Sequence, residues 1–242
     1  MMKRIVASIG ASMLIVGAVA WSAPAREVGP PTSGTPCATL DPDLFVSVID
    51  NPYYPLPVGR TLVYRGVKDG QRQVDRVRVT SKTKVIGGVT ATVVRDVARS
   101  GSKVLEATSD WFAQDVDGNV CYLGEDTKHF DPNGHVDTSG SWEAGVDGAV
   151  SGIIMLADPQ VPDAYRQEYY VGQAEDTAWI TNVSGSLTVP YGTVHQVVTS
   201  LEASVLEPDV IDQKFYAPGI GIVLERAIAG DVEFARLVRV TG

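Results

Sequence analysis

From Gly59 to the C-terminus, the chain is a succession of short runs of alternating apolar and polar residues, separated by glycine-containing turns. A period of two is typical of strands with one buried face, and no stretch keeps a 3.6-residue helical period over three turns. Gly87-Gly88 and Asp117-Gly118 lie between β-rich runs, where such dipeptides form tight hairpin turns. The pattern therefore predicts about twelve short strands joined mainly by hairpins.

This pattern predicts a mainly β fold with short helical segments, in which a single antiparallel sheet is curved or forms a partly open barrel. A sheet of this many strands tends to curl or close, and the inner face of a curled sheet can hold a ligand. We expect one β domain over residues 41–242. Within it, Leu40 to Ile49 is predicted to form a short helix opened by Asp41-Pro42, and residues 125–164 a long connection across the sheet.

Two regions of the predicted sheet contain an irregularity in the alternating pattern, and we expect the strands to be divided there. In the run from Gln73 to Thr80, Val74, Val77 and Val79 alternate with Arg76 and Arg78, and Asp75 is one slip in the alternation. A separate strand is predicted after it, over residues 84–86. Farther on, a turn at Gly185 is predicted to separate a strand at 177–183 from another at 187–189.

The N-terminal residues predict export. Lys3 and Arg4 precede an uncharged apolar run, and Ala23-Pro24-Ala25 has the form of a signal-peptidase site. The run is shorter than the about 20 residues of a membrane span. We expect residues 1–25 to be a signal peptide cleaved near Ala25, although a retained anchor is the alternative. Residues 26–40 would then be a flexible leader, and the mature protein, secreted or held in the cell envelope, would have no integral membrane segment.

Charge and cysteine content narrow the possible partners. The chain carries a net charge of −9 at pH 7, which disfavours nucleic acid and charge-driven adhesion to an anionic membrane. Its two cysteines, Cys37 and Cys121, are predicted to form a disulfide in an oxidising compartment. A lipid anchor on Cys37 is disfavoured because Thr35-Pro36 precedes it. Neither cysteine has metal-ligand spacing to a partner, and we predict no metal and no cofactor.

Several strings resemble those of a family of exported bacterial proteins of unknown function, of actinobacterial type. They are DNPYYPLPVG at 50–59, DWFAQD and GNVCYLGEDT at 110–115 and 118–127, GSWEAGVDG at 140–148, and FYAPGIGIV at 215–223. The likeness extends from about Asp41 to the C-terminus. The last string is also similar to the closing hairpin of curved-sheet envelope proteins and lipoproteins. These resemblances imply an exported curved-sheet protein and bring no assigned reaction.

Carboxylates beside aromatic or basic residues are the candidate ligand-binding positions. Such pairs suit a cleft that binds or hydrolyses a sugar, although paired acids are also common structural features of β proteins. The candidates, all in the segment that holds the densest acidic sequence, are Trp111, Tyr122, Glu125, Asp126, Trp142, Glu143, Arg166 and Glu168.

Two functions remain open at this point, and whether the protein is an enzyme is not decided. The favoured hypothesis is a non-catalytic exported protein that binds a small apolar or amphipathic ligand, or an envelope component, on the concave face of its sheet. The alternative is a secreted glycan or ester hydrolase with a carboxylate-rich cleft. No complete catalytic signature is present, so we predict no catalytic residue and expect Glu143 and Glu168 not to be a catalytic pair. Convergence of Glu125, Asp126, Glu143 and Glu168 in one pocket would favour the hydrolase.

Overall fold

The computed structural model describes residues 36–242 except 69 and 231, and its main feature is one 16-stranded antiparallel sheet. The helical elements are α1 (Pro36–Thr39) and a single 3₁₀ turn (Pro42–Leu44). The strands are β1 (Phe45–Val46), β2 (Thr61–Lys68), β3 (Gln71–Ile86), β4 (Val89–Ser100), β5 (Lys103–Asp115), β6 (Val120–Phe130), β7 (Val136–Asp137), β8 (Trp142–Glu143), β9 (Val150–Met155), β10 (Ala164–Arg166), β11 (Glu168–Tyr169), β12 (Asp176–Val189), β13 (Gly192–Ser204), β14 (Ile211–Ala217), β15 (Gly221–Ala229) and β16 (Phe234–Thr241).

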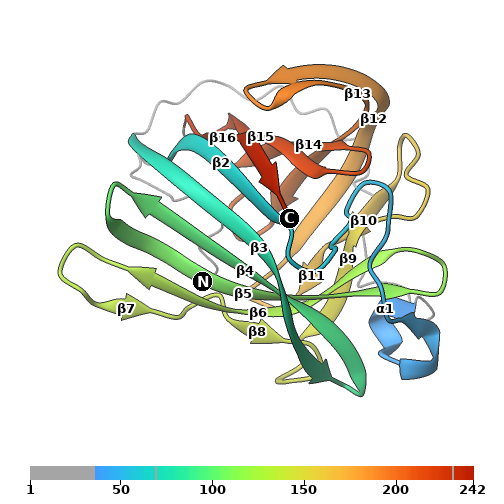
Figure 1. Ribbon diagram of the computed structural model, residues 1–242. Coiled ribbons are helices and arrows are strands. Elements are labelled where there is room, and N and C mark those ends of the chain that lie inside the picture. The colour runs from blue at the N-terminus through green and yellow to red at the C-terminus, as the bar shows by residue number, and fades with distance from the viewer. Residues whose placement is uncertain (1–35, 69, 231) are drawn as a thin grey trace, which may run out of the picture.

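The sheet curls until its two ends nearly meet (Figure 1). Its strand order is β10-β12-β13-β14-β15-β16-β2-β3-β4-β5-β6-β9-β11, and the end strands β10 and β11 are separated in sequence by Gln167 alone. The chain thus crosses the seam at Gln167, whose backbone N–H donates to the carbonyl of Asp176 over 2.8 Å. Gly152 on β9 permits this crossing, because a Cβ there would lie 2.4 Å from the Gln167 carbonyl carbon. The predicted fold class is confirmed, in its partly open barrel form.

Both predicted hairpin turns are confirmed. Gly87 and Gly88 connect β3 to β4 with φ values of 55° and 92°, the left-handed conformation that a two-residue hairpin turn requires at both positions. The turn between β5 and β6 contains Gly118 at φ 93°, and Asp115 accepts from the backbone N–H of Asn119 over 2.8 Å. These turns set the register of the strands that line the barrel.

Two strands are longer than the sequence pattern predicted. β3 runs unbroken through residues 80–83, where its register with β4 shifts, and β12 runs through Gly185, where its register with β13 shifts. The predicted turn at Gly185 is therefore wrong: a glycine inside a strand also marks a bulge, which bends the strand without ending it. In β3, Asp75 shares the inner face with Val77, whereas Val74 is 41% exposed on the outer face. The residue that interrupts the alternation of apolar and polar side chains is therefore Val74 and not Asp75.

The predicted helix over Leu40 to Ile49 is also wrong. Asp41 does cap a helical turn, since its side chain accepts from the backbone N–H of Asp43, but the turn ends at Leu44. Phe45 and Val46 then pair with β5. Extended pairing with an available strand outweighs the weak helix propensity of this Val-rich segment. The end of the expected leader forms α1.

The expected connection over residues 125–164 is only partly irregular. Its first residues extend β6 to Phe130, and its apolar islands form β8 and β9; none of the described residues there is helical. The predicted signal peptide, its cleavage site and most of the leader lie outside the described residues. Within the described part of the chain, no helix has the length and apolarity needed to cross a bilayer.

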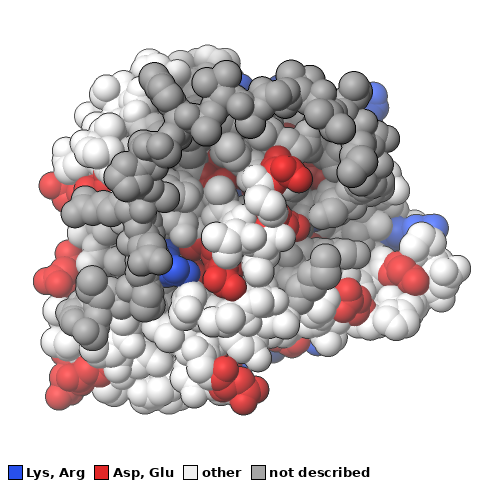
Figure 2. Space-filling view, turned by 180° about the vertical axis from the view of Figure 1, so that it is seen from behind, with Lys and Arg blue, Asp and Glu red and all other residues white. Residues whose placement is uncertain are grey.

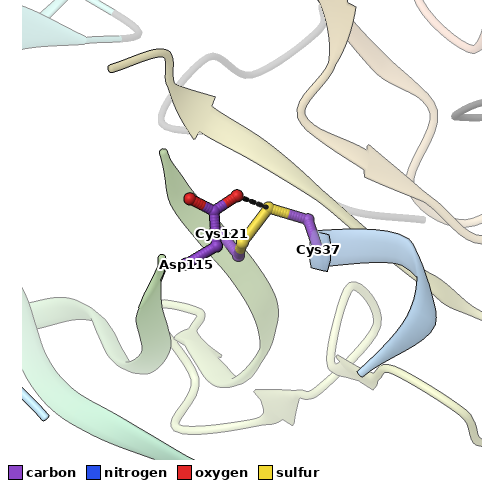
Figure 3. Close-up of side chains that lie close together, drawn as sticks. All are labelled: Cys37, Asp115 and Cys121. Atoms are coloured by element: carbon purple, nitrogen blue, oxygen red, sulfur yellow. Dashed lines mark hydrogen bonds between the residues drawn. A yellow bond between two sulfur atoms is a disulfide. The ribbon is translucent and has the colours of Figure 1, made fainter. Parts of the chain in front are cut away.

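The predicted disulfide is confirmed. Cys37 of α1 is bonded to Cys121 of β6, with 5.4 Å between the α-carbons, and both residues are fully buried (Figure 3). The carboxylate of Asp115 lies 4.0 Å from the Cys37 sulfur. Because a disulfide sulfur carries no proton, this contact is a close approach and not a true hydrogen bond. These three residues also group their potential metal-ligand atoms, but the bond between the sulfurs removes both thiolates as ligands.

Candidate functional site

The barrel encloses a cavity of about 200 Å³. Ten of its lining residues are acidic: Asp75, Asp96, Glu106, Asp110, Glu125, Glu168, Asp176, Glu202, Asp212 and Glu225. Among the described residues that line it, the only Lys or Arg is Lys214. Seen from behind, the middle of the molecule is hollowed and shows acidic side chains in the recess (Figure 2).

Four of these carboxylates form what we call the acidic wall: Asp75, Asp96, Asp110 and Glu125. They come from the four consecutive strands β3, β4, β5 and β6. Asp110 stands directly opposite Glu125, and Asp96 stands opposite Val77 and Thr108. Directly paired residues of an antiparallel sheet share one face, so the hairpin registers place all four on the inner surface. No ion pair among the described residues includes any of the four.

The hydrogen bonds of the acidic wall require protons. The Tyr122 hydroxyl lies 2.9 Å from Asp110 Oδ1 and 3.0 Å from Glu125 Oε2, yet a phenol has one proton and can donate to only one of them. The second contact is a hydrogen bond only if that carboxyl group is itself protonated. Burial raises the pKa of Asp110 to about 7, with the nearby charges of Glu106 and Asp75 adding to the effect.

The pKa values of two other members of the wall, Glu125 and Asp96, are raised in the same way. Burial raises the pKa of Glu125 well above its usual value, and the charge of Asp110 raises it further. The pKa of Asp96 is also raised well above its usual value, first by burial and then by the charge of Asp75 and a hydrogen bond with it. The acidic wall therefore holds more protons in the folded protein than free carboxyl groups would at the same pH.

On the opposite side of the cavity, a lysine stands among several acidic side chains. Lys214 on β14 lies 2.7 Å from Glu202 and 3.9 Å from Glu225. These carboxylates raise the pKa of Lys214 above its usual value and more than offset the lowering effect of burial. Glu202 also accepts hydrogen bonds from Ser200 and Tyr216. At one end of the acidic side, Glu106 lies 3.3 Å from His129 and 4.0 Å from Lys68. Unlike Glu106, Glu202 and Glu225, the members of the acidic wall thus have no Lys, Arg or His ion-pair partner among the described residues.

Aromatic rings and one amide complete the lining. The Phe112 ring lies 5.4 Å from the Tyr54 ring, edge-on, and stacks on Tyr122 at 4.9 Å between centroids. Such rings present apolar surface and negative π faces to a bound group. Gln167, at the seam, is only 3% exposed, and its Nε2 has no hydrogen-bond partner in the described structure. A buried amide without a partner is costly in a folded protein and here faces the cavity, where a ligand could satisfy it.

The structure brings three of the eight sequence-predicted residues to the cavity: Tyr122, Glu125 and Glu168. Trp142 lies behind this lining, where its Nε1 donates to Glu168 over 3.1 Å and its ring meets Tyr122 edge-on. It therefore holds Glu168 and Tyr122 in place without itself lining the cavity. A ligand-binding role for any of these four residues stays a prediction.

The other four candidates lie away from the cavity lining. Lys84 stands 3.3 Å from the centre of the Trp111 ring and 2.7 Å from Glu143. The remaining two make local contacts: Asp126 is 49% exposed in its side chain and pairs with Lys128, and Arg166 stacks on Tyr169. Of the four carboxylates whose convergence would favour a hydrolase, only Glu125 and Glu168 line the cavity.

Sequence reasoning missed Asp75, Asp96 and Asp110, although each carries a readable signal. Every one of them is two residues from an apolar side chain of the same strand that also lines the cavity: Val77, Val94 and Phe112 respectively. A carboxylate in phase with the buried face of a strand is unusual and indicates either a buried polar network or a site. Lys214 and Gln167 gave no comparable signal, because the pairings of β14 and of the seam are long-range.

Comparisons with known proteins give two distant structural matches and no family. No protein-family model matches the chain, and no curated protein matches it. A crystal structure described as an exported protein with a YmcC-like fold, from Bacteroides fragilis, aligns with a TM-score of 0.46 and 15% identity, covering 79% of this chain and 100% of that one. One described as a lipoprotein, from Parabacteroides distasonis, aligns at 0.38 and 12%, covering 79% and 99%. The suggested actinobacterial group and its sequence strings gain no support from these matches.

Proposed function

We propose that this protein is an exported, non-catalytic binding protein whose barrel interior holds a small amphipathic ligand with a positively charged group. The observation that carries the proposal is the acidic wall: four carboxylates on adjacent strands that face the cavity and have no cationic partner among the described residues. A purely apolar ligand, which the sequence alone favoured equally, would leave these carboxyl groups without compensation.

The negative charge of the acidic wall favours a ligand group with a positive charge. A cation bound near Asp96 and Asp110 would stabilise their ionised forms, lower their raised pKa values and release protons. The carboxylates are spread over four strands, which suits an organic cation with a diffuse charge, such as an alkylammonium group. The Phe112 and Tyr122 side chains, which also line the cavity, belong to the aromatic class that attracts such groups.

The remaining lining accounts for the apolar part of the ligand. Leu56, Leu62, Val94, Ile154 and Ile222 contribute to the cavity between the charged residues. Binding sites for small molecules are commonly concave and mostly apolar, with a few polar groups that fix orientation. Export is part of the same proposal and rests on the signal-peptide pattern of residues 1–25.

The proposal predicts a preference for cations among ligands that share one tail. Isothermal titration calorimetry at pH 8 with octyltrimethylammonium, octanol and octyl sulfate is expected to show the tightest binding for the cation. Asp96→Asn combined with Asp110→Asn is expected to weaken cation binding by about tenfold or more, because two desolvated charges that face the ligand are lost. Binding of the cation is also expected to weaken at pH 5, where Asp110, with a pKa of about 7, is protonated.

Asp126→Asn is the matched control, since Asp126 follows Glu125 directly but is exposed. Its affinity for the cation is expected to stay within about twofold of the unaltered protein. Equal affinity for octanol and the cation would refute the charge assignment. Failure of all three compounds to bind would refute the use of the cavity for amphipathic ligands.

One observation favours the alternative, a hydrolase. Asp110, with a pKa of about 7, and Glu125 both lie within hydrogen-bond distance of Tyr122, so one carboxyl group could act as an acid while the other acts as a base. This pair replaces Glu143 and Glu168 as the catalytic candidate, because Glu143 pairs with Lys84 and does not line the cavity.

A hydrolytic role predicts turnover of simple aryl glycosides or esters that falls by about two decades or more in Glu125→Gln. Glu143→Gln is the control, and its turnover is expected to equal that of the unaltered protein. We expect no turnover in this screen. Hydrolysis that is abolished by Glu125→Gln and unaffected by Glu143→Gln would replace the binding function by the hydrolase.

A further inference from the structure

One part of the outer surface of the barrel is chemically opposite to its interior. Strands β16, β2, β3 and β4 lie side by side in the sheet (Figure 1) and contain eight of the chain's 13 arginines. We call these eight the arginine patch: Arg65, Arg72, Arg76, Arg78, Arg95, Arg99, Arg236 and Arg239. The only described carboxylates on the same four strands, Asp75 and Asp96, line the cavity.

The strand registers place these arginines on one face. Arg65 stands directly opposite Arg236, and Arg78 stands directly opposite Arg95. Seven of the eight are exposed, and Arg95 is half-buried with its Nη1 donating to Ser109. Among the described residues, no ion pair includes a member of the patch.

Such a surface is unfavourable for the isolated protein. Like charges directly opposite each other on neighbouring strands destabilise a sheet, and here two such pairs occur within one patch. An anionic partner would remove this repulsion. Guanidinium groups form bidentate hydrogen bonds with phosphate more readily than ammonium groups do, and on these four strands arginines outnumber lysines by eight to three.

The shape of the patch indicates the kind of partner. Four strands and the span from Arg72 to Arg78 cover about 15 by 20 Å, given the usual spacing between strands and rise per residue. A single linear polyanion would follow one row of charges, whereas these arginines extend in two dimensions. From this geometry, we infer that the patch docks the protein on the phosphate headgroups of an anionic membrane. The net charge of −9 does not indicate this basic surface, because ten of the acidic residues line the cavity inside the barrel.

Vesicle binding tests this inference with the purified exported protein. Vesicles of phosphatidylcholine mixed with phosphatidylglycerol are expected to bind it, with binding that weakens as salt rises, and pure phosphatidylcholine is not. Arg76→Gln combined with Arg78→Gln is expected to weaken binding by about tenfold or more. Lys103→Gln combined with Lys128→Gln removes the same charge from β5 and β6, and is expected to change binding by less than about twofold.

A second patch variant, Arg236→Gln with Arg239→Gln on β16, guards against a local folding defect, and melting temperatures are measured for all variants. Both patch variants should lose vesicle binding while they keep the fold. Equal binding to neutral and anionic vesicles would overturn the inference, as would equal losses in the patch and control variants. Binding to dextran sulfate without binding to vesicles would overturn it too, in favour of a soluble polyanion.

Discussion

Reduction of the Cys37–Cys121 disulfide is expected to lower the melting temperature by about 10 °C. The bond closes a segment with a sequence separation of 84 residues. In the chain-entropy model, a loop of that length contributes about 4–5 kcal/mol to the free energy of unfolding. For a domain of this size, each kcal/mol corresponds to about 2–4 °C. The bond also anchors α1 to β6, where the buried Cys37 belongs to the main core cluster.

Differential scanning calorimetry with and without reductant measures this effect, and a thiol titration establishes that reduction is complete. The double variant Cys37→Ser with Cys121→Ser should melt at the lower temperature and should not respond to reductant. An unchanged melting temperature in fully reduced protein would show that α1 and its contacts contribute nothing to the cooperative unit.

Neutralising the acidic wall is expected to stabilise the protein at pH 8. Asp110 has a pKa of about 7 in the folded protein, against an ordinary value of 3.8. A raised carboxyl pKa means that the folded state binds the proton more tightly than the unfolded state does, so stability falls as pH rises from about 4 to about 7 and then levels off. Asp110→Asn keeps an acceptor for the Tyr122 hydroxyl and removes the charge. We expect its melting temperature at pH 8 to rise by about 5 °C or more.

The pH profile distinguishes this effect from a general change in packing. The unaltered protein should be more stable at pH 5 than at pH 8, and Asp110→Asn should reduce that difference. Asp126→Asn, which removes an exposed charge, should leave the profile as it is. A melting temperature of Asp110→Asn that is lower than that of the unaltered protein at both pH values would contradict the electrostatic account.

Much of the barrel was predictable because the residues that form its hairpin turns act over a short stretch of sequence. Gly87-Gly88 and Asp117-Gly118 adopt hairpin turns for steric reasons that act within a few residues, and two adjacent hairpins fix which strands pair. The disulfide was predictable because the chain has two cysteines and its N-terminal pattern indicates export to an oxidising compartment. The helix predicted after Asp41 is limited to a single turn, because long-range pairing with β5 outweighs the weak helix propensity of this segment. The turn predicted at Gly185 was wrong because a glycine between two apolar runs is equally consistent with a turn and with a bulge.

The site was less predictable, because a side chain's neighbours across a barrel are set by pairings far apart in sequence. The sequence by itself determined most of the long strands, the hairpin turns and the cysteine pair. Only the tertiary structure decided that Asp75 and Asp96 point inward while Arg76 and Arg78 point outward. The alternation of side chains along a strand separates these residues onto two faces, but it does not say which face is enclosed. Closure of the sheet made one face a cavity and the other the surface, and so divided the charges between them.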